Sequence, residues 1–373
     1  MLLGAAGAAH AVQDCELNGQ SVSPSNGHST AGKTGLMRCK DRDSGDVQRE
    51  QELQNGVFMG VSRYYEHGQR VKDFSVNAKG NMQGLAREYA SGALVREASY
   101  RDGSEIGLSR AFYPSGALRR ATFYDDAGKE QAFAEFTERG QLYNLRCADR
   151  AALAPAADDE RWCGFSGAPS NVEFFDAKGR LRSRASFTLG KRLRSETLYD
   201  NGTASVQEHI DGTRKTERRW SEDGVKRRET VWQLVDRGSI KLRESEYSDR
   251  GTLAREQRWS DGGVLQSDDT FYLNGQPRSA AVYAGARAAR YADVVAFHDN
   301  GQRAAQGRYL AGDDAANAPI GVHQSFNARG TLVAESHFDG QGRLTRERSW
   351  DDSGQLQRDD EVFEDGSRKA YSK

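Results

Sequence analysis

Residues 247–262 read Tyr-Ser-Asp-Arg-Gly-Thr-Leu-Ala-Arg-Glu-Gln-Arg-Trp-Ser-Asp-Gly, and the same pattern recurs along most of the 373-residue chain. In each copy an aromatic residue is followed, after two or three positions, by glycine and then by leucine. Self-similarity at a short period indicates a repeat array, in which units pack on their neighbours and together offer a long surface. The repeat glycines, mostly 22 to 29 residues apart and often 24, are Gly68, Gly92, Gly116, Gly140, Gly179, Gly202, Gly224, Gly251, Gly275, Gly301, Gly330 and Gly354.

Within a unit, the residues after the glycine alternate with a period of two, which is typical of a half-buried strand. In five units, every second residue starting from the leucine lies on the same face of the strand. These units are Leu94 to Tyr100, Leu118 to Tyr124, Leu181 to Phe187, Leu253 to Trp259 and Leu344 to Trp350. Asp-Gly pairs close several of these strands, at Asp102-Gly103, Asp211-Gly212 and Asp261-Gly262. The pattern therefore predicts an all-β fold of consecutive antiparallel hairpins with a period of about 24 residues.

The opposite side of these strands carries carboxylates. Glu97, Glu256, Glu335 and Glu347 occupy this side. We expect them to pair with arginines on neighbouring strands, each pair contributing some tenths of a kcal/mol.

The composition predicts a thin sheet with much of both faces in water. Hydrophobic residues make up 36% of the chain and the mean hydropathy is -0.80, yet aromatic residues reach 9%. The chain has 53 basic and 54 acidic residues and a net charge of -1. This balance argues against a nucleic-acid partner, because such a protein needs a net basic surface to displace counterions.

The N-terminus indicates export. Met1 to Ala11 is small and apolar and ends in Ala-His-Ala, so residues 1–11 are interpreted as the remnant of a signal peptide cleaved before Val12. A short apolar tail without a targeting role is the alternative. No stretch approaches the ~20 apolar residues of a membrane helix. The prediction is a soluble protein of the periplasm.

The four cysteines are expected to form disulfides, because the count is even and the chain is exported. Three pairings are possible. The local one, Cys15–Cys39 and Cys147–Cys163, is the natural choice and would stabilise each loop by about 3 kcal/mol. No C-x-x-C motif or neighbouring histidine indicates zinc, and no metal site is expected.

The irregularities of the repeat divide the chain into segments. Residues 12–56 are expected to form an N-terminal cap with a disulfide loop, residues 57–146 a first hairpin array, and residues 171–373 a second array. Between the arrays, residues 147–170 form an insertion bracketed by cysteines. Residues 311–319 lengthen another connection.

The units resemble a known repeat. Tyr247 to Gly262, Phe326 to Gly340 and Tyr89 to Gly103 are similar to the variant MORN repeat of the YwqK family of bacterial antitoxins. The resemblance covers most of the chain from about residue 57, with a break at 147–170. It implies an elongated, twisted antiparallel sheet and a role in binding and neutralising a toxin. The export signal, the cystine loops and the length resemble periplasmic immunity proteins that counter type VI secretion effectors, several of which are phospholipases.

No motif indicates catalysis or a cofactor, and the chain is not expected to be an enzyme. Gly27 to Thr34 matches the phosphate-binding P-loop, but no apolar strand precedes it and no long helix follows, so it is interpreted as a contact loop. The acidic doublets Asp125-Asp126, Asp268-Asp269 and Asp359-Asp360 are expected in or beside turns.

Two regions are candidates for binding a partner protein. One is the basic stretch 214–228 with Trp220, Trp232, Arg218, Arg219 and Arg227, because exposed aromatic residues and arginines anchor interfaces. A solvated strand face with neighbouring glutamates is its alternative. The other is the insertion, with Trp162. The expected partner is a cognate effector such as a phospholipase. The alternative function is an envelope structural or lipid-binding module, although the near-zero net charge argues against membrane contact.

Overall fold

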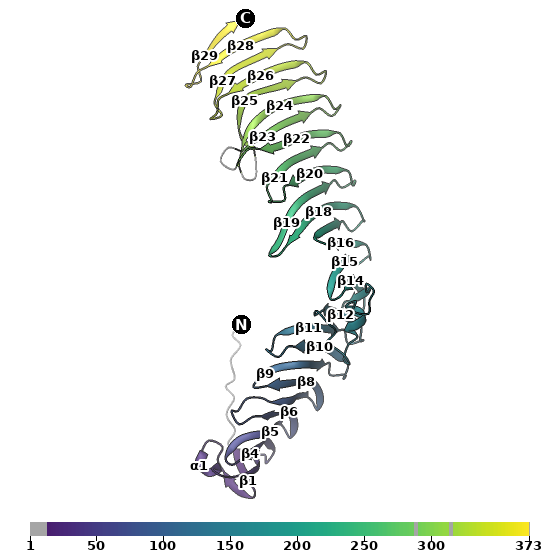
Figure 1. The fold of residues 1–373 in the computed structure, drawn as a ribbon, viewed down its shortest axis with the longest axis vertical. Coiled ribbons are helices and arrows are strands. Elements are labelled where there is room, and N and C mark those ends of the chain that lie inside the picture. Colours follow the sequence, from purple (N-terminus) through teal and green to yellow (C-terminus); the bar gives the residue numbers. More distant parts are fainter. Residues whose placement is uncertain (1–12, 287–289, 313–315, 373) are drawn as a thin grey trace. The chain divides into compact units, whose positions relative to one another are not determined.

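The computed structural model describes residues 13–286, 290–312 and 316–372 and is almost entirely β-sheet (Figure 1). The signal-peptide prediction at residues 1–11 lies outside the described residues. The strands form two antiparallel sheets, of 12 and 17 strands, and the all-β hairpin array is confirmed. The chain divides into two units, Met1–Arg192 and Leu193–Lys373. Neither described helix has the length and apolar character needed to cross a bilayer.

The first sheet follows chain order except at its first edge, where β1 lies between β3 and β2. Its strands are β1 (Gln13–Leu17), β2 (Gln20–Val22), β3 (Gly35–Asp41), β4 (Val47–Gln54), β5 (Val57–Glu66), β6 (Gln69–Val76), β7 (Gly84–Ala90), β8 (Ala93–Arg101), β9 (Ser104–Phe112), β10 (Leu118–Tyr124), β11 (Glu130–Phe136) and β12 (Leu142–Arg146). The two described helices are α1 (Gly27–Thr30) and α2 (Asp159–Trp162).

The second sheet follows chain order throughout. Its strands are β13 (Val172–Phe175), β14 (Leu181–Thr188), β15 (Lys191–Leu198), β16 (Ala204–Asp211), β17 (Arg214–Trp220), β18 (Lys226–Val235), β19 (Gly238–Tyr247), β20 (Leu253–Trp259), β21 (Leu265–Phe271), β22 (Pro277–Ala284), β23 (Tyr291–Phe297), β24 (Arg303–Ala311), β25 (Ala316–Phe326), β26 (Leu332–Phe338), β27 (Leu344–Trp350), β28 (Leu356–Val362) and β29 (Arg368–Ser372).

Turns recur at half the period seen in the sequence, and many of them are three-residue loops. In the example at Asp125, the Gly128 N–H donates to the Asp125 carbonyl and the Asp125 N–H donates to the Lys129 carbonyl, while Gly128 has φ 76°. This is a three-residue hairpin loop that ends in a left-handed glycine. The Asp125 side chain also accepts from the N–H groups of Ala127 and Lys129. The 24-residue period is therefore two strands and two turns, and the repeat glycines mark the turns of one edge.

Two Asp-Gly predictions differ in their outcome. Asp102-Gly103 is a two-residue hairpin loop with φ of 48° and 86°. Asp261-Gly262 is not, because the turn there uses the three-residue loop and places Gly263 at φ 76°. Glycine is needed at that last position, since only there does the backbone enter the left-handed region.

The aromatic residue of the repeat fastens successive hairpins. The Tyr199 hydroxyl donates to the Trp220 carbonyl at 2.9 Å, and the Tyr272 hydroxyl donates to the Phe297 carbonyl at 2.8 Å. In the first unit Tyr113 makes the same bond to the carbonyl of Phe136 at 2.8 Å. Each bond joins the start of one turn to the strand end before the next turn on that edge.

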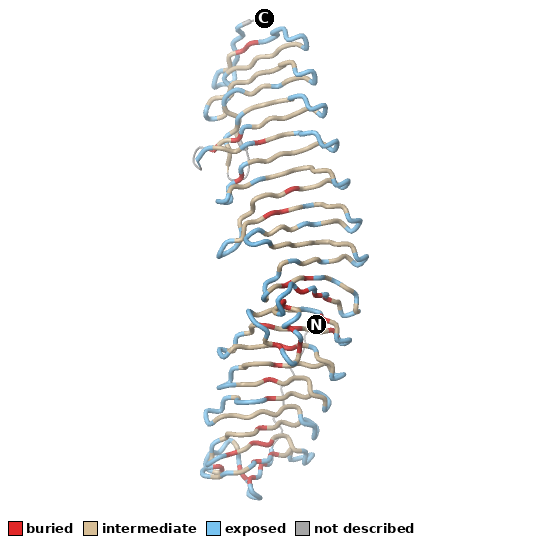
Figure 2. The backbone as a smooth tube through the Cα atoms, turned by 45° about the vertical axis from the view of Figure 1, so that its right-hand side comes forward, coloured by how far each residue is buried: buried red, intermediate tan, exposed pale blue. Residues whose placement is uncertain are grey.

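The sheets are thin, as the composition predicts, and most of the chain is half-buried or exposed (Figure 2). The main cores lie in the first unit. One surrounds the Cys15–Cys39 disulfide and includes Leu17, Met37 and Leu53. The other lies where the insertion, closed by the Cys147–Cys163 disulfide, covers β10 to β14. The local cysteine pairing is confirmed.

The expected segment borders differ from the observed units. The strands β1 to β4 of the expected cap share one sheet with the first array, because β4 pairs with β5. The first unit also extends to Arg192, since β13 and β14 pack on the insertion through Phe174 and Phe187. Within the cap, the P-loop match contains the four-residue helix α1 where a loop was expected, and Lys33 donates to Gln20 at 3.2 Å.

Candidate binding surface

A row of alternating charges crosses one face of the first unit. In-register pairing aligns one residue from each of eight successive strands of the sheet, from β1 through β3 to β9, and paired residues share a face. The aligned residues are Glu16, Arg38, Glu50, Arg63, Asp73, Arg87, Glu97 and Arg110. We call the four arginines, Arg38, Arg63, Arg87 and Arg110, the arginine row. The predicted cross-strand pairing of Glu97 with arginine is confirmed.

The carboxylates lie below the guanidinium groups. Glu97 accepts from Arg87 Nε at 2.8 Å and from Arg110, and its side chain is 12% exposed against 42% and 41% for the two arginines. Glu50 is 9% exposed and accepts from Arg38 at 2.9 Å and Arg63 at 3.1 Å. The outer layer of this face is therefore rich in guanidinium, although the row as a whole is neutral.

The arginines hold these carboxylates ionised. Burial acts to raise the pKa of Glu97, but hydrogen bonds from Arg87 and Arg110 and the charges of both arginines outweigh it, so the pKa lies below its usual value. The pKa of Glu50 is lowered in the same way, with burial opposed by hydrogen bonds from Arg38, Tyr65 and Arg63.

Tyrosines extend the same surface. The Tyr65 hydroxyl donates to Glu50 at 2.9 Å, and the Tyr89 hydroxyl donates to Asp73 at 3.1 Å. Arg70 lies over the Tyr89 ring at 5.4 Å and pairs with Asp73 at 2.9 Å. Arginine and tyrosine together are the composition enriched at protein interfaces.

The row becomes apolar where the insertion covers it. After Arg110 the next aligned residues are Ala121 and Ala134, both fully buried. Trp162 packs there, with its ring 6.0 Å from that of Phe136. Trp162, a predicted contact residue, is thus half-buried in the core of the first unit, because α2 turns it toward the sheet.

A shallow groove lies at one turn edge of the first unit. Its volume is about 550 Å³, and Tyr113, Arg119, Arg120, Phe136 and Tyr143 are among its lining residues. Arg120 donates to Glu135 at 2.6 Å, so the groove is lined by an arginine–glutamate pair of the kind found in the charged row.

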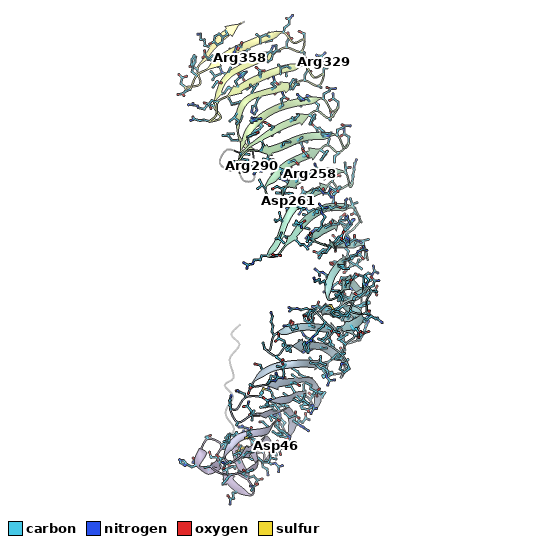
Figure 3. All side chains as sticks on the ribbon, in the orientation of Figure 1. Asp46, Arg258, Asp261, Arg290, Arg329 and Arg358 are labelled. Carbon is cyan, nitrogen blue, oxygen red and sulfur yellow. A yellow bond between two sulfur atoms is a disulfide. The ribbon has the colours of Figure 1, made fainter. Side chains whose placement is uncertain are left out.

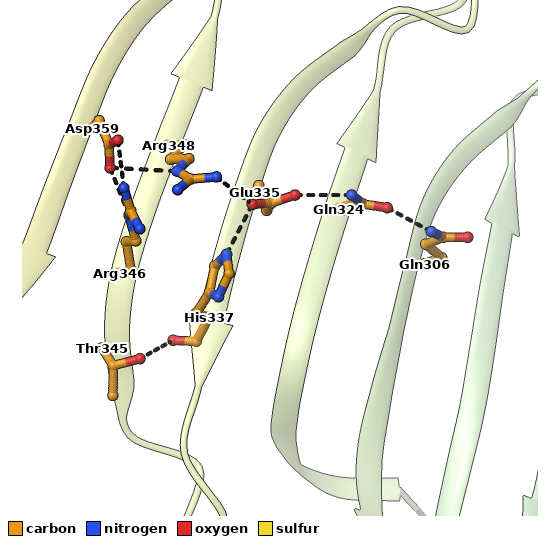
Figure 4. Close-up of polar contacts among 8 residues, drawn as sticks. All are labelled: Gln306, Gln324, Glu335, His337, Thr345, Arg346, Arg348 and Asp359. Atoms are coloured by element: carbon orange, nitrogen blue, oxygen red, sulfur yellow. Dashed lines mark hydrogen bonds and ion pairs between the residues drawn. The ribbon is translucent and has the colours of Figure 1, made fainter. Parts of the chain in front are cut away.

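The strands of the second unit carry side chains on both faces (Figure 3), and polar contacts link some of these side chains into a row. One chain of contacts crosses β24 to β28 (Figure 4) and links Gln306, Gln324, Glu335, Arg348 and Asp359. His337 Nε2 also lies 2.8 Å from Glu335 Oε1. Burial acts to raise the pKa of Glu335, but hydrogen bonds from Gln324 and His337 outweigh it, so the pKa is lowered.

The predicted arginines of the stretch 214–228 are paired. Arg218 donates to Glu229 at 2.8 Å and Arg219 to Glu217 at 2.6 Å, and Arg227 pairs with Asp249. These contacts match the alternative description, a solvated strand face with neighbouring glutamates.

The two tryptophans predicted with these arginines, Trp220 and Trp232, do not share a patch. Trp232 pairs in register with Lys215, whose ammonium lies 5.0 Å from its ring centre. Trp220 is five residues from Lys215 on β17, an odd number, so it lies on the opposite face. A binding role for these residues stays a prediction.

The acidic doublets also differ from expectation. Asp268-Asp269 lies within β21 and Asp359-Asp360 within β28, not at turns, so the two carboxylates of each doublet lie on opposite faces. Only Asp125-Asp126 lies at a turn. In the described part of the chain, no group of three or more histidine, cysteine or acidic residues is arranged to hold a metal ion.

Sequence reasoning missed the arginine row because the row exists only across strands. A signal is present in the sequence: charges of alternating sign recur at roughly half the repeat, at Glu50, Arg63, Asp73, Arg87, Glu97 and Arg110. Reading it requires the strand register.

Similarity of the chain to known proteins is found among solved structures. No protein-family model and no curated protein matches it. Among solved structures it is similar to TcdB2-TccC3-Cdc42, at 12% identity and a TM-score of 0.17, over 96% of this chain and 20% of that chain. It is also similar to the Photorhabdus luminescens Tc holotoxin pore, at 12% identity and a TM-score of 0.18, over 90% of this chain and 18% of that one. The chain spans about a fifth of those chains, and the likeness carries no argument about function.

Proposed function

We propose that this protein is a periplasmic immunity protein that binds a cognate antibacterial effector, such as a type VI secretion phospholipase, and neutralises it. The observation that carries the proposal is the arginine row with Tyr65 and Tyr89, an extended surface of the residue types that anchor protein interfaces. The protein acts by covering its target, without catalysis.

The two disulfides support a site of action outside the cytoplasm. Structural disulfides form and persist in oxidising compartments, and both of these close local loops. Within that environment the periplasm is the compartment where an immunity protein would meet an incoming effector.

The test is protection. The product of the neighbouring gene is directed to the periplasm with and without this protein, and cell survival is counted. We expect killing in its absence and survival in its presence, with the two proteins co-purifying. Cells that survive the neighbour equally well without this protein would refute the proposal.

The alternative, an envelope module that binds lipid, makes a different prediction. It requires the protein to sediment with anionic vesicles and to lose that binding as salt is added. Because the row holds equal numbers of arginines and carboxylates and so exerts little long-range attraction on an anionic surface, we expect no sedimentation.

A further inference from the structure

The arginine row has a regular spacing. Its members lie on β3, β5, β7 and β9, so one strand, which carries a carboxylate of the row, separates each arginine from the next. Adjacent strands are about 4.8 Å apart, which puts successive arginines about 9.6 Å apart across the face.

Each guanidinium keeps donors for a ligand. A guanidinium has about five N–H groups. Arg87 donates Nε to Glu97, Arg63 donates Nη1 to Glu50, and Arg110 donates Nη2 to Glu97. At exposures of 35% to 42%, their remaining N–H groups are accessible from solvent.

The charge balance selects the class of ligand. The row holds four arginines and four carboxylates, so its field largely cancels beyond a Debye length of ~8–10 Å. A membrane surface or a nucleic acid, recognised through long-range attraction, gains little here. A protein that reaches the guanidinium layer directly gains charge-assisted hydrogen bonds.

The spacing selects the secondary structure of that protein. Along an α-helix, residues seven apart lie on one side and are about 10.5 Å apart, close to the arginine spacing. Along a strand, residues on one side recur at about 6.7 Å and about 13 Å, which match it poorly.

We propose that the arginine row binds an acidic α-helix of the partner protein, laid across the strands with a carboxylate at every seventh residue. The insertion bounds this surface at β10 to β12, where the aligned residues become apolar and covered. The inference rests on the proposed function only in taking the ligand to be a protein.

The experiment uses the full chain and two synthetic helical peptides, each of about 28 residues, which is four seven-residue repeats. One carries glutamate at every seventh position, and the other has the same composition with the glutamates distributed around the helix. Titration calorimetry should show binding of the first peptide, weakened by salt, and at least about tenfold weaker binding of the second. Equal binding of both peptides, or of neither, overturns the inference.

Substitutions in the arginine row test where on the protein the peptide binds. Arg63→Gln and Arg87→Gln should each weaken binding about tenfold, and Arg87→Lys should weaken it less, because the charge stays and the fork of donors is lost. The matched control is Arg96→Gln, in the same hairpin but on the other face, where Arg96 pairs with Glu105 at 2.6 Å. An equal loss with Arg96→Gln would refute the placement.

The outcome is separable from that of the proposed function. Peptide binding together with failed protection would refute the immunity role and keep the helix-binding surface. Protection that is unchanged by Arg63→Gln and Arg87→Gln, with no peptide binding, would refute the surface and keep the role. Binding to phosphatidylglycerol vesicles that Arg87→Gln removes would show a lipid ligand and overturn the inference.

Discussion

Glu97→Gln should destabilise the first unit measurably, because the Glu97 carboxylate accepts from two arginines. The substitution keeps the shape of the side chain and removes the charge that two arginines share. A hydrogen bond to a charged group contributes about 1.5–3 kcal/mol. Because both arginines are two-fifths exposed, solvent screens part of this. We therefore expect a loss of about 2 kcal/mol for the pair of bonds together.

The matched control is Glu88→Gln in the same hairpin. Glu88 is 39% exposed and pairs with Lys72 at 3.3 Å, so its loss should cost less than about 0.5 kcal/mol. Urea unfolding followed by hydrogen-exchange mass spectrometry of β7 to β9 reports this unit separately from the second. The midpoint for Glu97→Gln should fall by roughly 0.5–1 M urea. An equal shift in the two variants would refute the reasoning.

The pH dependence gives an independent check. The folded pKa of Glu97 is lowered, so its stabilisation is fully present above the unfolded value of about 4.3 and is lost as the pH falls through the folded pKa. The gap between wild type and Glu97→Gln should thus be constant near neutrality and close in strong acid, where both side chains are neutral. A gap that persists in acid would show that shape, and not charge, causes the difference.

Three further predictions concern the repeat and the insertion. Tyr199→Phe removes one hydroxyl bond between hairpins and should lower the stability of the second unit by about 1 kcal/mol, measured by thermal unfolding. Gly307→Ala places a methyl group 2.3 Å from a histidine ring and should cost about 1–3 kcal/mol, whereas Gly340→Ala, with open space around it, should be close to neutral; equal effects would refute the packing argument. Replacing Cys147 and Cys163 together by serine should cost about 3 kcal/mol and increase binding of an apolar dye, because the insertion then opens from the core it covers; unchanged dye binding would show that the insertion holds without its disulfide.

The sequence predicted the local structure well because the information is local. Glycine is favoured where a turn enters the left-handed region, and alternation follows from the pleat of a strand, so both are visible along the chain. The local disulfides were predictable too, since each cysteine pair is separated by 24 or 16 residues. The position of the acidic doublets was not, because aspartate is favoured in turns, whereas Asp268 and Asp359 lie in strands, where each pairs with an arginine of the neighbouring strand.

The candidate surface could not be predicted in this way. Trp162 is an exposed anchor or a core residue according to how the insertion folds back, and α2 packs it against Phe136. On its own strand, the residues that share a face with Arg87 are uncharged. Its partner Glu97 comes from the next strand. Which residues meet across strands depends on the register, and each three-residue loop shifts that register by one position at its bulge.

Periodicity along the chain by itself determined that this protein is a ladder of hairpins, since turns and alternation are properties of neighbouring residues. The even number and short separations of the cysteines indicated the two local disulfides. Only the folded sheet decided which charges form a row. It also decided where the row ends, at the buried alanines that the insertion covers. The physical reason is that hydrogen bonding between strands brings into contact residues that lie ten or more positions apart, and burial then selects apolar side chains where the insertion covers the sheet and ion pairs where water remains.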